Sequence, residues 1–309
     1  MTVVVRLGLK IDVDTLAGLQ KGVPALLEIL GERGIRASFF LALGPDHSGK
    51  AIFRVFRQRG FLAKMLRTRA PSLYGWRTLL SGTLLPAPDL GQAAGELMPR
   101  VRAAGHEVGL HGYDHVLWHD RLLTMTKEEI RGQVAAAQGV YQRALGTPAR
   151  AFAAPGWQTS RAAREVLAEM GFHYASDTRG TAPYFPRFGD WVSPVPEIPT
   201  TLPTLDELLG FKGLSAREAF RLVEQRVLRR TIPQIFTLHA ELEGGPLGGE
   251  FARFLDRLLA QGAVFFRLGD WAAELLGNRE MIPAARVFPG RLPGRAGRVS
   301  CQAQEEEGA

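Results

Sequence analysis

The sequence contains a single cysteine, Cys301, near its C-terminal end. One thiol can form neither an intrachain disulfide nor a cysteine metal cluster, so both kinds of framework are excluded. The chain also lacks an apolar run of about 18 residues, the length that a membrane-spanning helix needs. Its N-terminus has no basic segment followed by an apolar stretch and a cleavage site, so we expect a cytoplasmic protein.

The residues that are abundant describe a folded protein with an excess of positive charge. Hydrophobic residues make up 46% of the 309 positions and charged residues 22%, which is typical of a globular chain with a sizeable core. The net charge is +7 and the sequence pI is about 9.9. Such a balance predicts an anionic partner: nucleic acid, a membrane surface or a phosphorylated substrate.

Apolar, β-rich segments alternate with helical patterns along most of the chain. We expect strands at 3–11, 36–43, 107–111, 149–154, 172–176, 234–239 and 263–268, and helices at 20–33, 93–104, 126–145, 160–170, from 215 onward and at 251–260. Two helices begin with a Ser/Thr-x-x-Glu pattern, at Thr126 and Ser215, which caps a first turn. This order predicts one α/β domain over residues 1–277, with a mainly parallel sheet and helices outside it.

Two regions interrupt this alternation. An insert at about residues 45–90, after the second expected strand, carries eight basic residues between His47 and Pro88 and no acidic one, interleaved with apolar and aromatic residues. The last segment, 278–309, is rich in Gly, Arg and Pro, so we expect a disordered tail there.

Histidines and aspartates at two places suggest a metal site. His111 and His115 are four residues apart, a spacing that puts both imidazoles on one face of a helical turn. Histidine pairs at this spacing also occur without any ligand. Asp12 and Asp14 end an apolar strand, where two carboxylates are costly unless they are paired or bind a cation; the alternative is that they cap a helix or lie in a loop. One carboxylate with two histidines is a common catalytic ligand set for zinc, cobalt, manganese, nickel or iron.

The polar residues gather where expected strands end. His239 closes the apolar strand 234–239 and Asp177 follows 172–176, as Asp12 and His111 follow strands of their own. A lone histidine at such a position is usually a core residue. In barrels, however, active sites are built at the carboxyl ends of the strands, so this clustering favours one shared site.

Taken together, these motifs resemble the polysaccharide deacetylase (NodB-homology) family over roughly residues 3–275. The resemblance rests on the Asp-x-Asp motif, the His-x-x-x-His motif and a late Leu-His, in this order along the chain. It implies a distorted (β/α) barrel with fewer than eight regular repeats. It also implies metal ligation by Asp14, His111 and His115, with Asp12 as general base and His239 as general acid.

Further segments resemble one branch of the family, at 11–15, 44–46, 72–76, 106–111, 176–180 and 239–241. Members of this branch remove the formyl group from a formamido sugar carried on a polyprenyl phosphate. The resemblance implies release of formate and a free amine, in the pathway that adds aminoarabinose to lipid A and gives polymyxin resistance. The alternatives are a deacetylase of another N-acylated sugar or small amide, or a non-catalytic lipid- or sugar-binding relative.

One departure from the family pattern concerns the general base. Family members carry an arginine that pairs with this aspartate, but the corresponding stretch, 151–157, has none. Asp177 and Arg179 are the candidates for the missing charge, and an ordinary surface ion pair between them is the alternative. Trp157 and Glu241 are further candidates for substrate binding or charge tuning.

The basic insert suits the interface of an anionic membrane. Short apolar runs flanked by Arg and Lys place cations among headgroups and apolar side chains below them. The candidate contacts are Arg54, Arg57, Lys64, Arg67 and Trp76. A solvated basic face and a nucleic-acid surface are the alternatives, but no nucleic-acid motif accompanies the insert. We therefore expect a peripheral protein at the cytoplasmic face of the inner membrane, and nothing in the sequence indicates an oligomeric state.

Overall fold

The computed structural model describes residues 4–53 and 80–304 of the chain. Its centre is a sheet of seven parallel strands in the order β5-β4-β3-β2-β1-β8, with β9 also paired to β1. The strands are β1 (Arg6–Val13), β2 (Ser38–Leu41), β3 (Glu107–Leu110), β4 (Ala151–Phe152), β5 (Tyr174–Ala175), β8 (Gln234–His239) and β9 (Val264–Phe266). The expected strands therefore form, although β4 and β5 are shorter than predicted.

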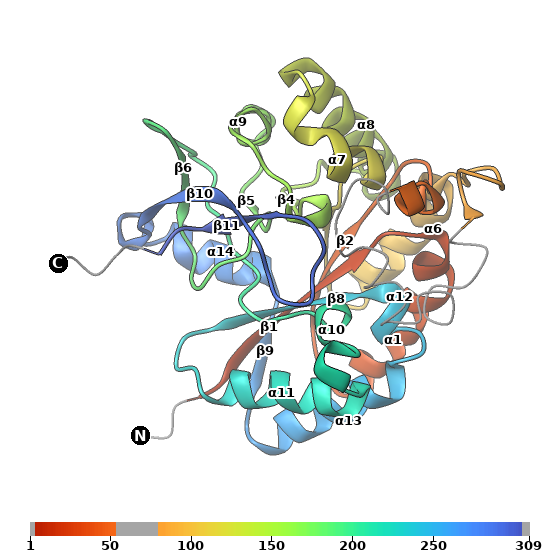
Figure 1. The fold of residues 1–309 in the computed structure, drawn as a ribbon, viewed down its shortest axis with the longest axis vertical. Helices are drawn as coiled ribbons and strands as arrows, with labels where there is room; N and C mark the ends of the chain where they lie inside the picture. The colour runs from red at the N-terminus through yellow and green to blue at the C-terminus, as the bar shows by residue number, and fades with distance from the viewer. Residues whose placement is uncertain (1–3, 54–79, 305–309) are drawn as a thin grey trace.

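Helices surround this sheet (Figure 1). The α-helices are α1 (Val23–Gly31), α6 (Leu90–Ala103), α7 (His115–Arg121), α8 (Lys127–Leu145), α9 (Arg161–Glu169), α10 (Leu205–Leu208), α11 (Ala216–Leu228), α12 (Ala240–Glu243), α13 (Gly248–Ala260) and α14 (Leu268–Leu276). Shorter turns are η1 (Gly18–Gly22), η2 (Ser48–Phe53), η3 (Leu122–Thr124), η4 (Pro155–Trp157), η5 (Phe211–Gly213) and η6 (Arg279–Met281). Capping boxes begin α8 at Thr126 and α11 at Ser215, as predicted. Across the described residues, no helix combines the length and apolar character needed to cross a bilayer.

An extended segment without a strand of its own lies between the two ends of the sheet. Ile198 donates its backbone N–H to Ala175 in β5, and the backbone N–H groups of Thr201 and Leu202 reach Ile235 in β8. This segment connects the edge strands of what is otherwise a half-barrel. The architecture is thus the distorted (β/α) barrel that the family resemblance implies.

Strand β1 lies in the middle of the sheet and has two chemically different faces. Leu7, Leu9 and Ile11 belong to the main hydrophobic core. Because side chains alternate along a strand, Lys10 and Asp12 face the other side, where they are almost completely buried. Two buried ionisable groups need partners that compensate their charges. Their side chains mark the face of β1 that lines the candidate site.

A second sheet covers one side of the barrel, in the order β11-β10-β6-β7. Its strands are β6 (Phe185–Phe188), β7 (Trp191–Val192), β10 (Ala284–Gly290) and β11 (Val299–Gln302). The prediction of a disordered tail from residue 278 is therefore wrong for residues up to 302. Val299 and Cys301 are buried beside Trp157, and this apolar alternation is hidden in the sequence by the Gly- and Arg-rich loop that precedes it.

The basic insert is described only at its two ends. Pro45 and Asp89 form an antiparallel bridge, and Asp46 donates its backbone N–H to Pro88, so the insert leaves and rejoins the fold at neighbouring points. The membrane-contact candidates fall outside the described residues: Arg54, Arg57, Lys64, Arg67 and Trp76.

Candidate active site

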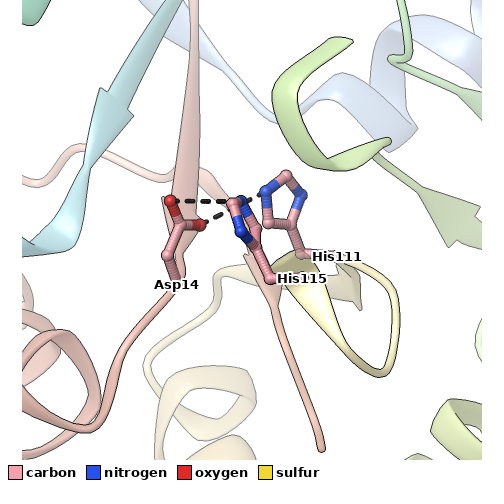
Figure 2. Close-up of side chains that lie close together, drawn as sticks. All are labelled: Asp14, His111 and His115. Carbon is pink, nitrogen blue, oxygen red and sulfur yellow. Dashed lines mark ion pairs between the residues drawn. The ribbon is translucent and has the colours of Figure 1, made fainter. Parts of the chain in front are cut away.

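Asp14, His111 and His115 converge at the carboxyl ends of the central strands (Figure 2). His111 Nε2 lies 3.2 Å from Asp14 Oδ1, and His115 Nε2 lies 3.4 Å from Asp14 Oδ2. One candidate ligand atom from each residue lies within 4.8 Å of the others. Two imidazoles and a carboxylate at this separation form a candidate site for one divalent ion.

The two histidines come from different elements, contrary to the expectation of one helical face. His111 extends β3, since its backbone N–H donates to Leu41 in β2. Gly112, with a φ of 77°, then turns the chain, and the Asp114 side chain caps α7, of which His115 is the first residue. The imidazoles are therefore brought together by a strand end and a helix start, and the four-residue spacing reflects the turn between them.

The surroundings of His111 suit a metal ligand. Its Nδ1 lies 2.8 Å from the backbone carbonyl of Ala153, which fixes Nδ1 as the protonated nitrogen of the neutral ring and leaves the Nε2 lone pair towards Asp14. Burial by itself lowers the pKa of His111, but the carboxylates of Asp12 and Asp14 raise it above its usual value. Burial by itself raises the pKa of Asp14, but His115 and His111 hold it well below the usual range. The site thus keeps a carboxylate charged and attracts positive charge.

Asp12 lies beside this group and faces His239. The two residues are register partners on the adjacent strands β1 and β8. Asp12 Oδ2 accepts a hydrogen bond from Lys10 Nζ at 2.9 Å and lies 4.0 Å from His111 Nε2. Its other oxygen, Oδ1, is buried and accepts no hydrogen bond from the described residues. One oxygen is therefore anchored and the other is available for a reacting group.

Lys10 is the residue that the sequence interpretation missed. Its side chain is fully buried and forms the ion pair with Asp12 for which an arginine was expected. A signal was present, because Lys10 interrupts an apolar strand two positions before Asp12 and so shares its face. The positive charge beside Asp12 comes from the same strand rather than from the 151–157 segment.

Asp177 and Arg179 have other partners. Asp177 Oδ2 accepts a hydrogen bond from Arg164 at 3.0 Å, and the same guanidinium nitrogen lies 2.9 Å from Glu197. Arg179 pairs with Glu207 at 2.6 Å. Asp177 is fully buried and Arg179 nearly so, which makes the alternative of a surface ion pair between them wrong.

Two buried glutamates hold the backbone on either side of the site. Glu241 Oε1 accepts hydrogen bonds from the N–H groups of Asp14 at 3.0 Å and Thr15 at 2.9 Å. Glu243 Oε2 accepts one from the N–H of His239 at 2.8 Å. Burial raises the pKa of both carboxyl groups to about 8. Glu241 therefore positions the chain that carries Asp14, and Glu243, which the sequence interpretation did not single out, does the same for His239.

Trp157 lies next to His239, with ring centroids 6.3 Å apart in an edge-on arrangement. Its φ of 54° is unusual for a bulky residue, and its indole Nε1 donates to Thr200 Oγ1 at 2.9 Å. This buried side chain therefore packs beside His239, and its role in substrate binding stays a prediction.

Comparison with known proteins places these residues in context. A family model described as "Polysaccharide deacetylase" matches residues 9–175. A protein of Shewanella sediminis named "Probable 4-deoxy-4-formamido-L-arabinose-phosphoundecaprenol deformylase" is 36% identical over 305 residues, which cover 97% of this chain and 95% of that protein. A protein of the same name from Wigglesworthia glossinidia brevipalpis is 31% identical, with coverage of 92% and 98%.

A solved structure shows the same fold. The probable polysaccharide deacetylase of Pseudomonas aeruginosa PAO1 superposes with a TM-score of 0.60 at 16% identity, over 89% of this chain and 91% of that one. At this level of identity the likeness concerns the barrel architecture.

Proposed function

The chain belongs to the polysaccharide deacetylase family and is a hydrolase of linear amide C–N bonds, and we propose that it deformylates 4-deoxy-4-formamido-L-arabinose joined through phosphate to undecaprenol. The proposed substrate is supported mainly by the nearly full-length match to two relatives named for this reaction. The products are formate and the free amine. The reaction belongs to the modification of lipid A with aminoarabinose, which gives resistance to polymyxin.

Asp14, His111 and His115 are the proposed ligands of one divalent metal ion. Such an ion, when bound, supplies a water of lowered pKa and polarises the amide carbonyl. The close approach of the three side chains and the bond from His111 Nδ1 to a backbone carbonyl support this assignment. The donor set suits zinc, cobalt, manganese, nickel or iron.

Asp12 and His239 are the proposed proton-transfer pair. Asp12 Oδ1 is the unoccupied oxygen of a carboxylate anchored by Lys10, so it is placed to take a proton from the attacking water. His239 gives a proton to the sugar nitrogen while the C–N bond breaks and the water oxygen becomes part of formate. Their register on adjacent strands supports their acting on the same amide.

The proposed substrate keeps its polyprenyl chain in a bilayer, so the enzyme works at the membrane surface. The net charge of +7 and the basic composition of residues 54–79 support peripheral binding to the cytoplasmic face of the inner membrane.

Flotation with anionic liposomes tests this proposed membrane binding. Reversal of Arg54, Arg57, Lys64 and Arg67 to Glu is expected to abolish flotation, whereas reversal of the exposed Arg221, Arg226, Arg229 and Arg230 is expected to preserve it. If both sets of reversals reduce flotation equally, the proposal that residues 54–79 form the membrane-binding surface is refuted.

Formate release from a synthetic lipid-linked formamido sugar is the test of the proposed reaction. The metal-loaded protein is expected to release formate from this substrate faster than it releases acetate from the acetamido counterpart. A preference for acetate would favour the deacetylase alternative. A protein that binds metal and releases neither acid would be a non-catalytic relative.

A further inference from the structure

Two arginines far apart in the sequence lie against the indole of Trp157. Arg179 follows β5, and Arg295 lies in the loop between β10 and β11. Their guanidinium carbons are 5.2 Å and 4.5 Å from the indole ring. Arg179 donates to the carbonyl of Leu202 at 2.8 Å, and Arg295 approaches the carbonyl of Gly156 at 3.5 Å. Cations stacked on an aromatic face are held in place by the ring.

The two guanidinium groups share one carboxylate oxygen. Glu207 Oε1 lies 2.6 Å from Arg179 and 3.7 Å from Arg295. Asp206, the preceding residue, accepts a hydrogen bond from the hydroxyl of Thr204. Only 10% of the Arg179 side chain and 11% of the Arg295 side chain is exposed. The two positive charges therefore lie close together at nearly buried positions, and such a pair of guanidinium groups attracts an anion.

The Trp157 indole that contacts the two arginines also lies near the proposed reacting groups. The same ring lies 5.2 Å from Lys10 Nζ and 6.3 Å, centre to centre, from His239. The loop between β10 and β11, which carries Arg295, passes over this end of the sheet towards α10 (Figure 1). Gly294 in this loop packs against the backbone of Glu207 in α10. An indole is about as wide as a pyranose ring, so a sugar whose amide nitrogen is at His239 can extend its anomeric substituent towards the arginines.

We propose that Arg179 and Arg295 bind the phosphodiester of the substrate, with Arg295 as a specificity-determining residue supplied by the C-terminal hairpin. This inference rests on the proposed function. A guanidinium group offers five N–H donors in a planar fork that matches phosphate oxygens, and hydrogen bonds between ionised partners are about twice as strong as neutral ones. The stacking on Trp157 orients the fork before the substrate arrives, which lowers the entropic cost of binding.

A pair of substrates separates phosphate recognition from a purely structural role of Arg295. One is a short-chain prenyl phosphodiester of the formamido sugar, and the other is the neutral methyl glycoside of the same sugar. Arg295→Met removes the charge but keeps an apolar side chain over the indole. Arg291→Met changes an exposed arginine of the same loop and serves as the matched control.

We expect Arg295→Met to raise KM and to lower kcat/KM about tenfold or more for the phosphodiester, while kcat/KM for the methyl glycoside changes less than about twofold. Arg295→Lys is expected to recover part of the loss, and Arg291→Met to match the unmodified protein. Equal losses on both substrates, or none on either, would overturn the inference and leave the proposed deformylation intact. If the unmodified, metal-loaded protein hydrolyses neither substrate, the proposed function itself is overturned, and the inference with it.

Discussion

The carboxyl edge of the seven-stranded sheet meets the four-stranded sheet β11-β10-β6-β7, here called the C-terminal sheet, at Trp157. The charged groups of the two regions are brought together in different ways. At the carboxyl edge, Asp12 and its partner Lys10 are two residues apart, and strand register brings His239 beside them. In the C-terminal sheet, Arg295 reaches the backbone of Gly156 from 139 residues away in the chain. The first arrangement follows from alternation and parallel pairing, whereas the second depends on how a late hairpin docks.

This difference separates two tasks. The carboxyl edge holds groups suited to metal binding and proton transfer, and they are positioned by buried main-chain hydrogen bonds such as those of Glu241 and Glu243. The loop between β10 and β11 contributes Arg295, a nearly buried cation that the proposed proton transfers do not require. Changes at the carboxyl edge should therefore abolish turnover on any substrate, and changes in the C-terminal sheet should alter recognition or stability alone.

The largest effect is expected for His115→Ala. Loss of one of three proposed ligands should reduce bound metal to well below one equivalent and turnover about a thousandfold or more, because the ion stabilises the transition state by several kcal/mol. Metal analysis and formate release measure the two effects together. His173→Ala, at an exposed histidine away from the site, should change neither. Full metal content in His115→Ala would remove this residue from the ligand set.

Asp12→Asn should separate chemistry from metal binding. The amide keeps the shape of the side chain but cannot accept a proton, so we expect full metal content with turnover about a hundred- to ten-thousandfold lower. Metal content and single-turnover rates on the same preparation provide the measurement. Near-normal turnover would show that another group is the base.

Lys10→Met tests whether the buried ion pair holds Asp12 in place. Removal of one partner leaves a buried carboxylate without its cation, and we expect the free energy of unfolding to fall by about 3–5 kcal/mol, with lower turnover as well. Chemical denaturation and formate release measure both quantities. The double variant Lys10→Met/Asp12→Asn should regain much of the stability and none of the turnover, because the pair is then uncharged. A double variant less stable than Lys10→Met would contradict this account.

Val299→Ala should affect the C-terminal sheet without affecting the carboxyl edge. Val299 is buried beside Trp157, and loss of its two methyl groups should cost about 2 kcal/mol. Metal content should remain unchanged while the thermal midpoint falls. A loss of metal in this variant would show that packing in the C-terminal sheet also affects the metal site at the carboxyl edge.

The smallest effect is expected for the pH dependence of stability at Glu243. Burial raises its pKa from 4.5 to about 8, so the folded state favours the neutral carboxyl. The stabilisation from this group is complete below about pH 4.5 and is lost as the pH rises through 8. Glu243→Gln should therefore flatten the decline of Tm between pH 5 and pH 9, because the amide does not ionise in this range. Glu96→Gln, at an exposed position, should leave the decline as it is.

Much of the barrel could be predicted because its signals are local. The apolar runs and the caps at Thr126 and Ser215 depend on neighbouring residues, and each of these features appears in the structure. The hairpin of β10 and β11 could not be predicted in this way. Strand β11 has only four residues, and the composition of the loop between β10 and β11 resembles that of a disordered tail.

By itself, the sequence determined that Asp12, Asp14, His111 and His239 stand at strand ends, because alternation and parallel pairing bring the carboxyl ends of strands to one edge. Only the tertiary structure decided which charges meet there. Lys10 became the partner of Asp12, and Asp177 and Arg179 found partners elsewhere, because buried ions are stable only beside groups that compensate them. That compensation depends on distances between elements, which the order of residues along the chain does not contain.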